Sequence, residues 1–350
     1  MKILHIGGCD KFLPPLIEFI KENFDFDQHE FLLRSGMGKA PDYPNVKVYE
    51  RKIIERLKFY IVALLKMHRA DKVILHGLFD IKLVFILFFT PWLLRKCYWV
   101  MWGGDLYVYQ LGDRNWKWRV REFFRRPVIK NIKCFTTTVP GDYKLAQDWY
   151  NIKSKWIHNL MYPSHLFRDA ETIICNKFDK TETYIQVGNS ADPSNNHFEV
   201  IESLVKFKNK NIKVFCPLSY GSEQHKHKVI EYGYKLLSDK FIPLTEFMSF
   251  EEYNSYMACI DIAIFNHDRQ QAMGNIIGLL SLGKKVVMKP SITPFTFFSD
   301  MAGIKIYTID DPNLLESLNK QESFNNIQKM KSYFNKERLR MNWTDVFDDE

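Results

Sequence analysis

The sequence lacks the short motifs that most often mark a nucleotide or metal site. It contains neither Gly-x-Gly-x-x-Gly nor the P-loop pattern Gly-x-x-x-x-Gly-Lys-Ser/Thr, which excludes the usual dinucleotide and P-loop phosphate sites. No Asp-x-Asp follows a predicted strand, and no group of His, Cys or carboxylate residues has metal-site spacing. We therefore expect a function that needs neither a metal ion nor a bound cofactor.

Cysteine and long apolar runs are also scarce. The six cysteines are widely scattered and form no Cys-x-x-Cys pair, which favours buried, reduced thiols in a cytosolic protein. The longest uncharged apolar run, residues 83–94, is interrupted by Pro91 and is shorter than the roughly 20 residues that cross a bilayer. Because Met1 almost directly precedes a predicted strand, we also expect no signal peptide.

Acidic residues are under-represented in one half of the chain. Residues 1–175 contain 28 Lys and Arg against 18 Asp and Glu, a net charge of +10. Residues 176–350 contain 21 against 23, a net charge of −2. The first half is therefore suited to an anionic partner, and the second half is not.

Strand-like and helix-like patterns alternate along the whole chain, which predicts parallel α/β sheets covered on both faces. At 350 residues there is room for two such domains. We predict a first domain at 1–168, a linker at 169–182, a second domain at 183–321 and a helical tail at 322–350 that crosses back to the first. The predicted strands are 2–6, 31–33, 46–48, 72–76, 98–102, 134–138, 155–157, 183–187, 213–216, 261–265, 285–288 and 305–307.

Two polar loops in the second half are the most informative stretches. Residues 188–197 and 266–275 each follow a predicted strand and lead into a predicted helix, the place where parallel sheets bind ligands. Helix starts attract phosphate through free N–H groups and the helix dipole, and Arg269 adds a fixed cation. We expect this region to bind a nucleotide diphosphate. Its candidate residues are Gly188, Asn189, Ser190, Asn196, His197, Tyr220, Arg269, Gln270, Gln271, Gly274 and Asn275.

Each of these residues also has a purely structural interpretation. Residues 194–196 supply side chains that typically cap a helix, and Arg269 is also compatible with an ordinary surface position. His197 suits either a nucleotide contact or a capping turn, and Tyr220 either a stacked base or the core. The two interpretations stay open at this stage.

The first half carries the candidate acceptor side. The segment 102–107, Trp-Gly-Gly-Asp-Leu-Tyr, follows a predicted strand and places Asp105 where a carboxylate can accept a proton from a sugar hydroxyl. His76, at the end of another strand, is the second candidate base, although a buried structural histidine also fits the pattern. Asp105 alternatively caps a helix. The remaining acceptor-side candidates are Gly7, Gly8, Trp102, Gly104 and Tyr107.

A basic segment with interleaved aromatic residues lies at 113–133. A basic amphipathic helix of this kind is typical of contact with an anionic membrane surface, although a solvated basic face over packed aromatics is the alternative. Its basic residues are Arg114, Lys117, Arg119, Arg121, Arg125, Arg126, Lys130 and Lys133.

The segments 102–107, 187–190 with His197, and 269–271 with Gly274 resemble those of the TDP-N-acetylfucosamine:lipid II N-acetylfucosaminyltransferase family. Their order and spacing agree from His76 to Gly283. The resemblance implies a metal-independent, two-Rossmann-domain (GT-B) glycosyltransferase at the inner face of the bacterial cytoplasmic membrane. Gly104 stands where the resemblance leads us to expect alanine, and 217–221 differs, so the family's exact sugar is not carried over.

The resemblance therefore predicts transfer of an amino-deoxyhexose or other deoxyhexose from a dTDP-sugar to an undecaprenyl-diphosphate-linked saccharide. The pathway implied is enterobacterial common antigen, O-antigen or capsule synthesis. In this hypothesis Arg269 stabilises the leaving diphosphate, and Asp105 or His76 takes the acceptor proton. Two other classes are compatible with the sequence: a sugar-nucleotide epimerase, and a non-catalytic basic protein that binds membrane or nucleic acid. The near-neutral second half argues against nucleic acid as a partner.

Overall fold

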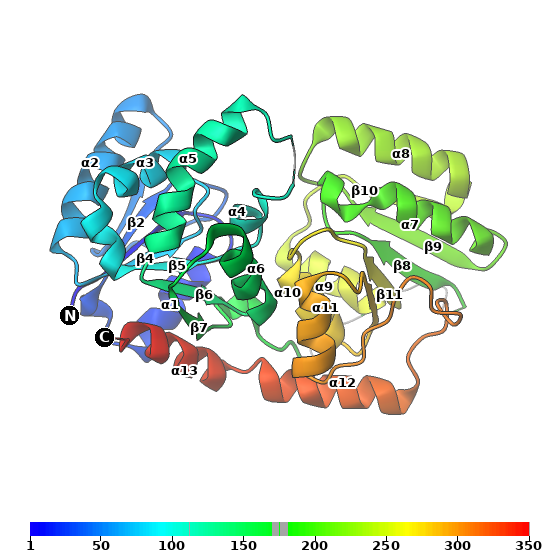
Figure 1. Ribbon diagram of the computed structural model, residues 1–350. Helices are drawn as coiled ribbons and strands as arrows, with labels where there is room; N and C mark the ends of the chain where they lie inside the picture. Colours follow the sequence, from blue (N-terminus) through cyan, green and yellow to red (C-terminus); the bar gives the residue numbers. More distant parts are fainter. Residues whose placement is uncertain (112, 170–174, 176–180, 350) are drawn as a thin grey trace. The chain divides into compact units, whose positions relative to one another are not determined.

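The computed structural model describes residues 1–111, 113–169, 175 and 181–349. The chain divides into two compact units, Met1–His165 with Lys336–Glu350, and Leu166–Asn335. Each unit is a parallel sheet with helices on both faces (Figure 1), so the α/β fold class predicted from the sequence is confirmed. Of the predicted linker 169–182, only Asp169, Cys175 and residues 181–182 lie within the described residues.

The sheet of the first unit has the strand order β3-β2-β1-β4-β5-β6-β7, with every neighbouring pair parallel. Its central strands β4 and β5 are buried along their whole length, which fits their apolar sequences, broken only by Lys72 and His76 at the ends of β4. The strands are Ile3–Gly8 (β1), His29–Arg34 (β2), Val46–Tyr49 (β3), Lys72–His76 (β4), Cys97–Val100 (β5), Cys134–Thr137 (β6) and Lys155–His158 (β7).

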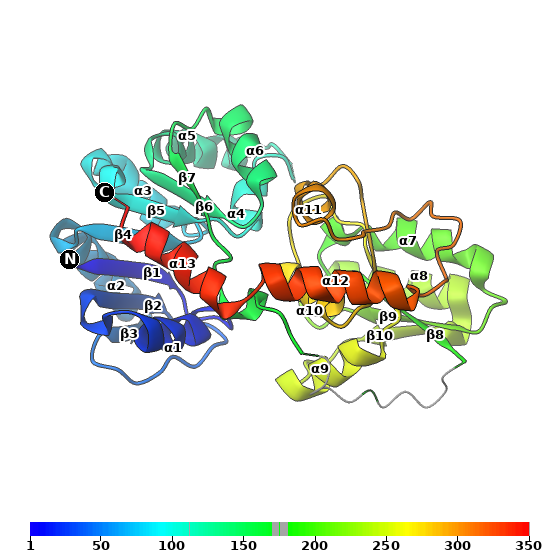
Figure 2. The same cartoon turned by 90° about the horizontal axis from the view of Figure 1, so that it is seen from below.

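Helices cover both faces of this sheet. Right-handed crossovers place α2, α3 and α5 over one face and α1 over the other, where α13 also packs (Figures 1 and 2). The helices of the unit are α1 (Leu13–Asn23), α2 (Ile53–Arg69), α3 (Ile81–Phe89), α4 (Gly104–Tyr107), α5 (Trp116–Asn131), α6 (Pro140–Tyr150) and α13 (Lys336–Phe347). Short 3-10 turns lie at Phe26–Gln28, Pro91–Lys96 and Pro163–His165.

The end of the chain is anchored in the first unit. The ring of Trp343 is fully buried and donates to the carbonyl of Met161 at 3.0 Å. The Lys72 ammonium donates to the carbonyls of Val346, Phe347 and Asp349 at 2.7–2.9 Å, so a cation satisfies the free carbonyls at the end of α13. Burial lowers the pKa of Lys72 to about 8.

The sheet of the second unit has the order β10-β9-β8-β11-β12, again parallel throughout. Helices α7 and α8 pack on one face, and α9, α10 and α12 on the other (Figure 1). The strands are Thr183–Val187 (β8), Ile212–Pro217 (β9), Phe241–Leu244 (β10), Ile262–Phe265 (β11) and Lys285–Met288 (β12). The helices are His197–Leu204 (α7), Glu223–Leu237 (α8), Phe250–Cys259 (α9), Met273–Ser281 (α10), Thr293–Thr296 (α11) and Lys320–Tyr333 (α12). Shorter turns lie at Pro193–Asn195, Val205–Phe207, Ser238–Lys240 and Phe297–Met301.

The structure differs from the sequence prediction in three elements. Strand β10 was not predicted, because Pro243 and a short length hide its pattern. Residues 305–307 form only an isolated bridge from Tyr307 to Val287 instead of a strand. The predicted tail helix is two helices, α12 in the second unit and α13 in the first, separated at 334–335.

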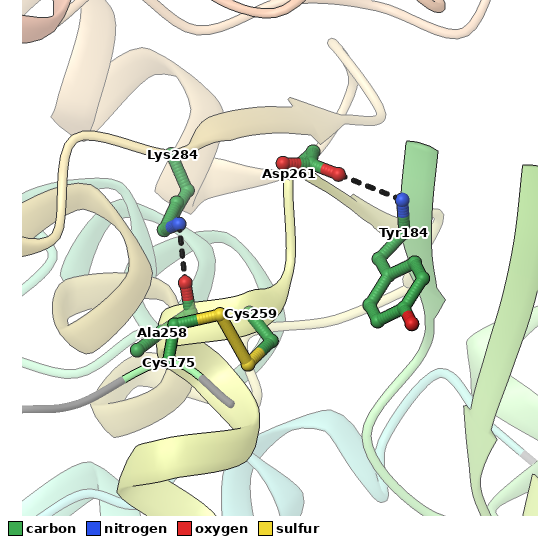
Figure 3. Close-up of a disulfide and its surroundings, with 6 residues drawn as sticks. All are labelled: Cys175, Tyr184, Ala258, Cys259, Asp261 and Lys284. Atoms are coloured by element: carbon green, nitrogen blue, oxygen red, sulfur yellow. Dashed lines mark hydrogen bonds between the residues drawn. A yellow bond between two sulfur atoms is a disulfide. The ribbon is translucent and has the colours of Figure 1, made fainter. Parts of the chain in front are cut away.

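The prediction for the cysteines was wrong in part. Cys175 and Cys259 form a disulfide near the end of α9 (Figure 3). The 84-residue separation between them and the lack of a recognisable spacing gave no signal in the sequence. The other cysteines, Cys9, Cys97, Cys134 and Cys216, are free and buried as expected.

The order of strands in each sheet fixes where ligands bind. Chain direction across the sheet reverses between β1 and β4 in the first unit and between β8 and β11 in the second. Parallel sheets bind ligands beside such switch points, at the carboxyl ends of the strands. The segments after these four strands are therefore the candidate site segments. Among the described residues, no helix is both long and apolar enough to span a bilayer.

Candidate active site

The two polar loops singled out in the sequence meet at the switch point of the second sheet. Strands β8 and β11 pair directly, and the Gly188 amide donates to the Ile264 carbonyl at 2.9 Å just beyond the last paired residues. Gly188 has a φ of +67°. A Cβ atom there would lie 2.6 Å from Asn195 Oδ1 and 3.0 Å from His197 Nε2, so glycine is required for the loop to fold back on itself.

Hydrogen bonds join the two loops into one network. Asn195 Oδ1 accepts from the Asn189 amide at 3.0 Å and lies 3.1 Å from His267 Nε2. The Gln271 side chain bridges to the first loop, because its Nε2 donates to Asn189 Oδ1 at 3.3 Å and its Oε1 lies 2.9 Å from the Ser194 hydroxyl. These contacts place the Asn189 side chain next to that of Gln271 and its backbone amide next to the Asn195 side chain.

The helices that follow the loops begin without side-chain caps. The N-cap residues Asn196 and Ala272 both have left-handed backbones, with φ of 53° and 58°. Asn196 donates its side-chain amide to the Asn266 carbonyl at 2.8 Å instead of capping α7, contrary to the capping interpretation of residues 194–196. No side chain caps the first turns of α7 and α10, and α10 carries Gly274 and Asn275.

Arg269 lies at this site and is paired. Its Nη2 donates to Asp192 Oδ2 at 3.1 Å, and its Nη1 donates to the Gln270 carbonyl at 3.3 Å. Burial alone would raise the pKa of Asp192, but bonds from Ser194 and the guanidinium bring that pKa below its ordinary value. The carboxylate therefore holds the guanidinium against the first loop and offsets part of its charge.

Three buried polar atoms without a partner in the described part of the chain lie at or next to this site. His197 Nδ1 lies 3.1 Å from His225 Nε2, whereas its Nε2 is buried and has no partner among the described residues. Burial, reinforced by His225, lowers the pKa of His197 to about 3, so the imidazole is neutral. Gln186 Oε1 and Gln270 Oε1 are likewise buried and unpartnered. Buried polar atoms are normally satisfied, and a bound ligand is one way to satisfy them.

Tyr220 closes one side of the network. Its hydroxyl accepts from Asn189 Nδ2 at 2.8 Å, and its ring is 41% exposed. The exposed ring of Phe247 lies nearly parallel to it, with an interplanar angle of 13° and centroids 6.3 Å apart. Sequence reasoning missed Phe247, because a single aromatic in a polar segment carries no pattern. Ser190 is buried in the same loop.

At the switch point of the first sheet, the two predicted glycines differ in role. A Cβ on Gly7 would lie 2.8 Å from Leu13 and 3.0 Å from His76, so Gly7 is needed for internal packing. A Cβ on Gly8 would meet only Asp10 Oδ2, at 4.0 Å, so Gly8 borders open space.

His76 is part of a buried hydrogen-bonded chain. Its Nε2 lies 3.1 Å from His5 Nδ1, and its Nδ1 lies 2.9 Å from the Tyr162 hydroxyl. His5 continues the chain to His29 at 3.0 Å, and Trp102 Nε1 donates to the Tyr162 hydroxyl at 2.7 Å. Burial lowers the pKa of His76 to about 3. Both ring nitrogens of His76 are therefore engaged inside the protein.

Asp105 is buried and joins two loops. Its carboxylate accepts from the Leu78 amide at 2.9 Å, from Trp99 Nε1 at 2.7 Å and from the Trp102 amide at 2.9 Å. Burial raises the pKa of Asp105, and these hydrogen bonds oppose the rise. Gly104 begins the short helix α4, and Tyr107 at its end donates to Asp142 at 2.8 Å.

We expect Asp105→Asn to lower the free energy of unfolding by about 1–3 kcal/mol. Both oxygens of Asp105 accept hydrogen bonds, and asparagine would replace one of them by an NH₂ group that cannot accept from the buried N–H donors around it. Urea unfolding measured beside exposed Asp148→Asn checks this. An Asp105→Asn protein with unchanged stability would contradict the structural role.

Asp10 is a candidate that sequence reasoning missed. It follows Gly7, Gly8 and Cys9 at the carboxyl end of β1, and Oδ1 accepts from the Phe12 amide at 2.7 Å. Burial raises the pKa of Asp10 to about 6, against the opposing effect of hydrogen bonds from backbone N–H groups at the start of α1. The Gly-Gly pair after the first strand was the signal that marked this segment.

The basic segment forms α5, but its charges are not all on the surface. Arg125 is buried, where it pairs with Glu122 at 3.2 Å and donates to the carbonyls of Leu78 and Asp105 at 2.8 and 2.5 Å. Trp116 and Phe123 are strongly exposed. A hollow of about 420 Å³ lies between α5 and the segment after β4, lined in part by Phe79, Trp118 and Arg121.

Comparisons with known proteins agree with this architecture. A family model described as 4-alpha-L-fucosyltransferase, glycosyl transferase group 56, matches residues 16–349. Solved structures similar to this chain include the Anabaena protein HepE in complex with UDP and glucose, with a TM-score of 0.69, 11% identity and coverage of 100% of both chains.

Two further structures have similar scores. The chain is similar to WaaG, a glycosyltransferase involved in lipopolysaccharide biosynthesis, with a TM-score of 0.65, 12% identity and coverage of 100% of both chains. Sucrose-phosphate synthase from Thermosynechococcus elongatus has a TM-score of 0.65 at 10% identity, covering 99% of this chain and 98% of its own. At such identities the likeness shows the fold alone, and that fold is GT-B, as the resemblance in the sequence implied.

Proposed function

Because the chain belongs to the 4-alpha-L-fucosyltransferase family, glycosyl transferase group 56, we propose that it transfers an amino-deoxyhexose or other deoxyhexose from a dTDP-sugar to a lipid-linked saccharide. The chain is a glycosyltransferase with the GT-B fold. The proposed pathway is bacterial surface polysaccharide synthesis, with an undecaprenyl-diphosphate-linked acceptor. The observation that carries the donor assignment is the junction of two polar loops and two uncapped helix starts at one switch point.

The diphosphate of the donor binds, in this proposal, against Gly188 to Ser190 and the first turn of α10. The Arg269 guanidinium makes two hydrogen bonds within the described residues, which leaves three of its five N–H groups for phosphate oxygens. Hydrogen bonds to a charged group contribute about 1.5–3 kcal/mol each. Gln270 and Gln271 add neutral amides, and we propose that these groups bind the diphosphate without a metal ion.

We assign the sugar and the nucleobase of the donor to opposite sides of that phosphate site. The unpartnered Nε2 of His197 and the side-chain amide of Asn275 suit sugar or phosphate oxygens. Asn196 donates one N–H to the Asn266 carbonyl and has a second N–H for the ligand. The exposed ring of Tyr220, tied to Asn189 and parallel to Phe247, suits a nucleobase. These assignments rest on position and chemistry together.

A general base in the first unit completes the reaction. The acceptor hydroxyl attacks the anomeric carbon, its proton passes to the base, and the bond to the diphosphate breaks with both electrons going to the phosphate oxygen. Asp105 and His76 would have to give up internal hydrogen bonds to serve as this base. We propose Asp10 instead, because its Oδ2 lies next to the open space at Gly8 and burial raises its pKa to about 6.

The acceptor is proposed to reach the first unit from an anionic membrane surface. Basic residues of 114–133 with the exposed Trp116 and Phe123 favour adsorption to such a surface. Gly8, Trp102, Gly104 and Tyr107 lie at or behind the segments where the acceptor saccharide would bind. The proposed location is the inner face of the bacterial cytoplasmic membrane.

The test is to incubate the purified protein with dTDP-, UDP- and GDP-sugars and a lipid-linked acceptor, and to measure the molecular masses of the products. We expect one sugar mass to be added to the acceptor, and thermal stabilisation by the matching nucleoside diphosphate. Conversion of the donor without acceptor would instead identify an epimerase. Stabilisation by oligonucleotides alone would contradict the proposal.

A further inference from the structure

Helix α2 has large aliphatic side chains on its solvent side as well as its packed side. Its buried face consists of Phe59, Ala63 and Met67, which contact the first sheet and its core. Its exposed aliphatic residues are Ile53 (83% exposed), Ile54 (69%), Leu57 (62%), Ile61 (52%) and Leu65 (53%). We call these five residues the α2 stripe.

The α2 stripe is a continuous surface and not a scatter of single exposures. At 100° per residue, its members fall within an arc of about 120°, centred well away from the buried face. A helix on the surface of a soluble protein normally has polar residues there. A contiguous exposed apolar patch of this kind marks an interaction surface.

Helices α3 and α5 lie on the same face of the sheet as α2 (Figure 1), and each also carries an exposed phenylalanine. At the end of α2, His68 accepts from Nε1 of Trp92 at 3.1 Å, and Trp92 is 56% exposed. Beyond it, the ring of Phe88 contacts those of Phe89 and Phe123, and the latter two are strongly exposed. Exposed apolar side chains therefore occur on α2, on the 3-10 turn Pro91–Lys96, on α3 and on α5.

Positive charge borders the stripe. Arg51, Lys52, Arg56 and Arg69 are exposed and make no ion pair among the described residues, while Glu55 is paired with Lys58 at 2.8 Å. Cations around an apolar strip, with an indole at its end, match an anionic lipid headgroup region over acyl chains. A symmetric pairing with a second copy would bring these like charges together, which is unfavourable.

We propose that the α2 stripe inserts into the interfacial region of an anionic bilayer, so that α2 lies along the membrane surface. This assigns to α2 an apolar contribution that is separate from the electrostatic attraction proposed for α5. The five aliphatic side chains supply the hydrophobic part of the binding free energy, and the basic residues beside them orient the helix on the membrane. The occupant is lipid and not another protein.

The experiment is vesicle sedimentation of the full chain and of Leu57→Ser/Ile61→Ser, with vesicles of equal parts phosphatidylglycerol and phosphatidylcholine. We expect the double variant to reduce the partition coefficient at least about tenfold, because several buried methylene and methyl groups are lost. The matched control is Phe324→Ser/Met341→Ser, at residues each 56% exposed on α12 and α13. The control should bind as the unaltered protein does.

Thermal unfolding and light scattering complete the test. Both changed positions are exposed, so we expect unfolding temperatures close to that of the unaltered protein. Equal vesicle binding by Leu57→Ser/Ile61→Ser and the unaltered protein would overturn the proposal. A dimer that this variant converts to monomer, without loss of vesicle binding, would overturn it in favour of a second copy. Because binding is read without catalysis, the result is independent of the proposed transfer reaction.

Discussion

Replacing Arg269 by alanine should lower the turnover number at least about a hundredfold, with little change in stability. Loss of a preorganised group that stabilises transition-state charge typically costs about 3–4 kcal/mol. Arg269 is held at the donor loops by Asp192, at 3.1 Å, and its side chain is only 18% exposed. Steady-state kinetics with saturating donor and acceptor measure the effect.

Two further variants sharpen this result. Arg269→Lys keeps the charge but loses the forked donors, so we expect partial activity. Arg340→Ala removes another ion-paired arginine, bonded to Glu337 at 2.7 Å on α13, and should leave turnover unchanged. An unchanged rate for Arg269→Ala would remove Arg269 from the mechanism.

Asp10→Asn should reduce kcat/KM by about 10²–10⁴-fold, the usual contribution of a general base. The amide keeps an oxygen for the Phe12 N–H, so we expect the fold to persist. The ionised form is the active base, and burial raises the pKa of Asp10 to about 6. The rate should therefore fall as the pH drops below about 6, and this acid limb should disappear in the variant.

The matched control is Asp71→Asn, because Asp71 also accepts a backbone N–H, from Lys2 at 2.7 Å, but at the opposite end of the sheet. It should retain both the rate and the pH profile. If Asp10→Asn keeps full activity while Asp105→Asn or a His76 variant loses the acid limb, the base is one of the residues predicted from the sequence instead.

The sequence was most informative where local patterns decide structure. Alternating apolar runs predicted nearly all the strands, because buried parallel strands need continuous apolar residues. The polar loops after 187 and 265 were recognisable because they interrupt those runs at strand ends. The segment around Asp105 was likewise recognised, but the sequence did not predict whether its carboxylate is accessible or buried.

Contacts between distant residues were not predictable in the same way. The chain from His29 through His5 and His76 to Tyr162 joins residues from different strands, and each histidine alone has no diagnostic spacing. The pairing of Arg269 with Asp192 spans 77 positions. The α2 stripe was hidden because a helix with two apolar faces resembles an ordinary buried helix in sequence.

The sequence by itself determined the two α/β units, the family and the loops that follow the central strands, since these depend on local periodicity and local motifs. The tertiary structure alone decided which strands lie at the switch points, which carboxylate is left accessible and which apolar side chains remain in solvent. The physical reason is that burial and charge depend on neighbours brought together by strand order, and a residue's own sequence context does not contain them.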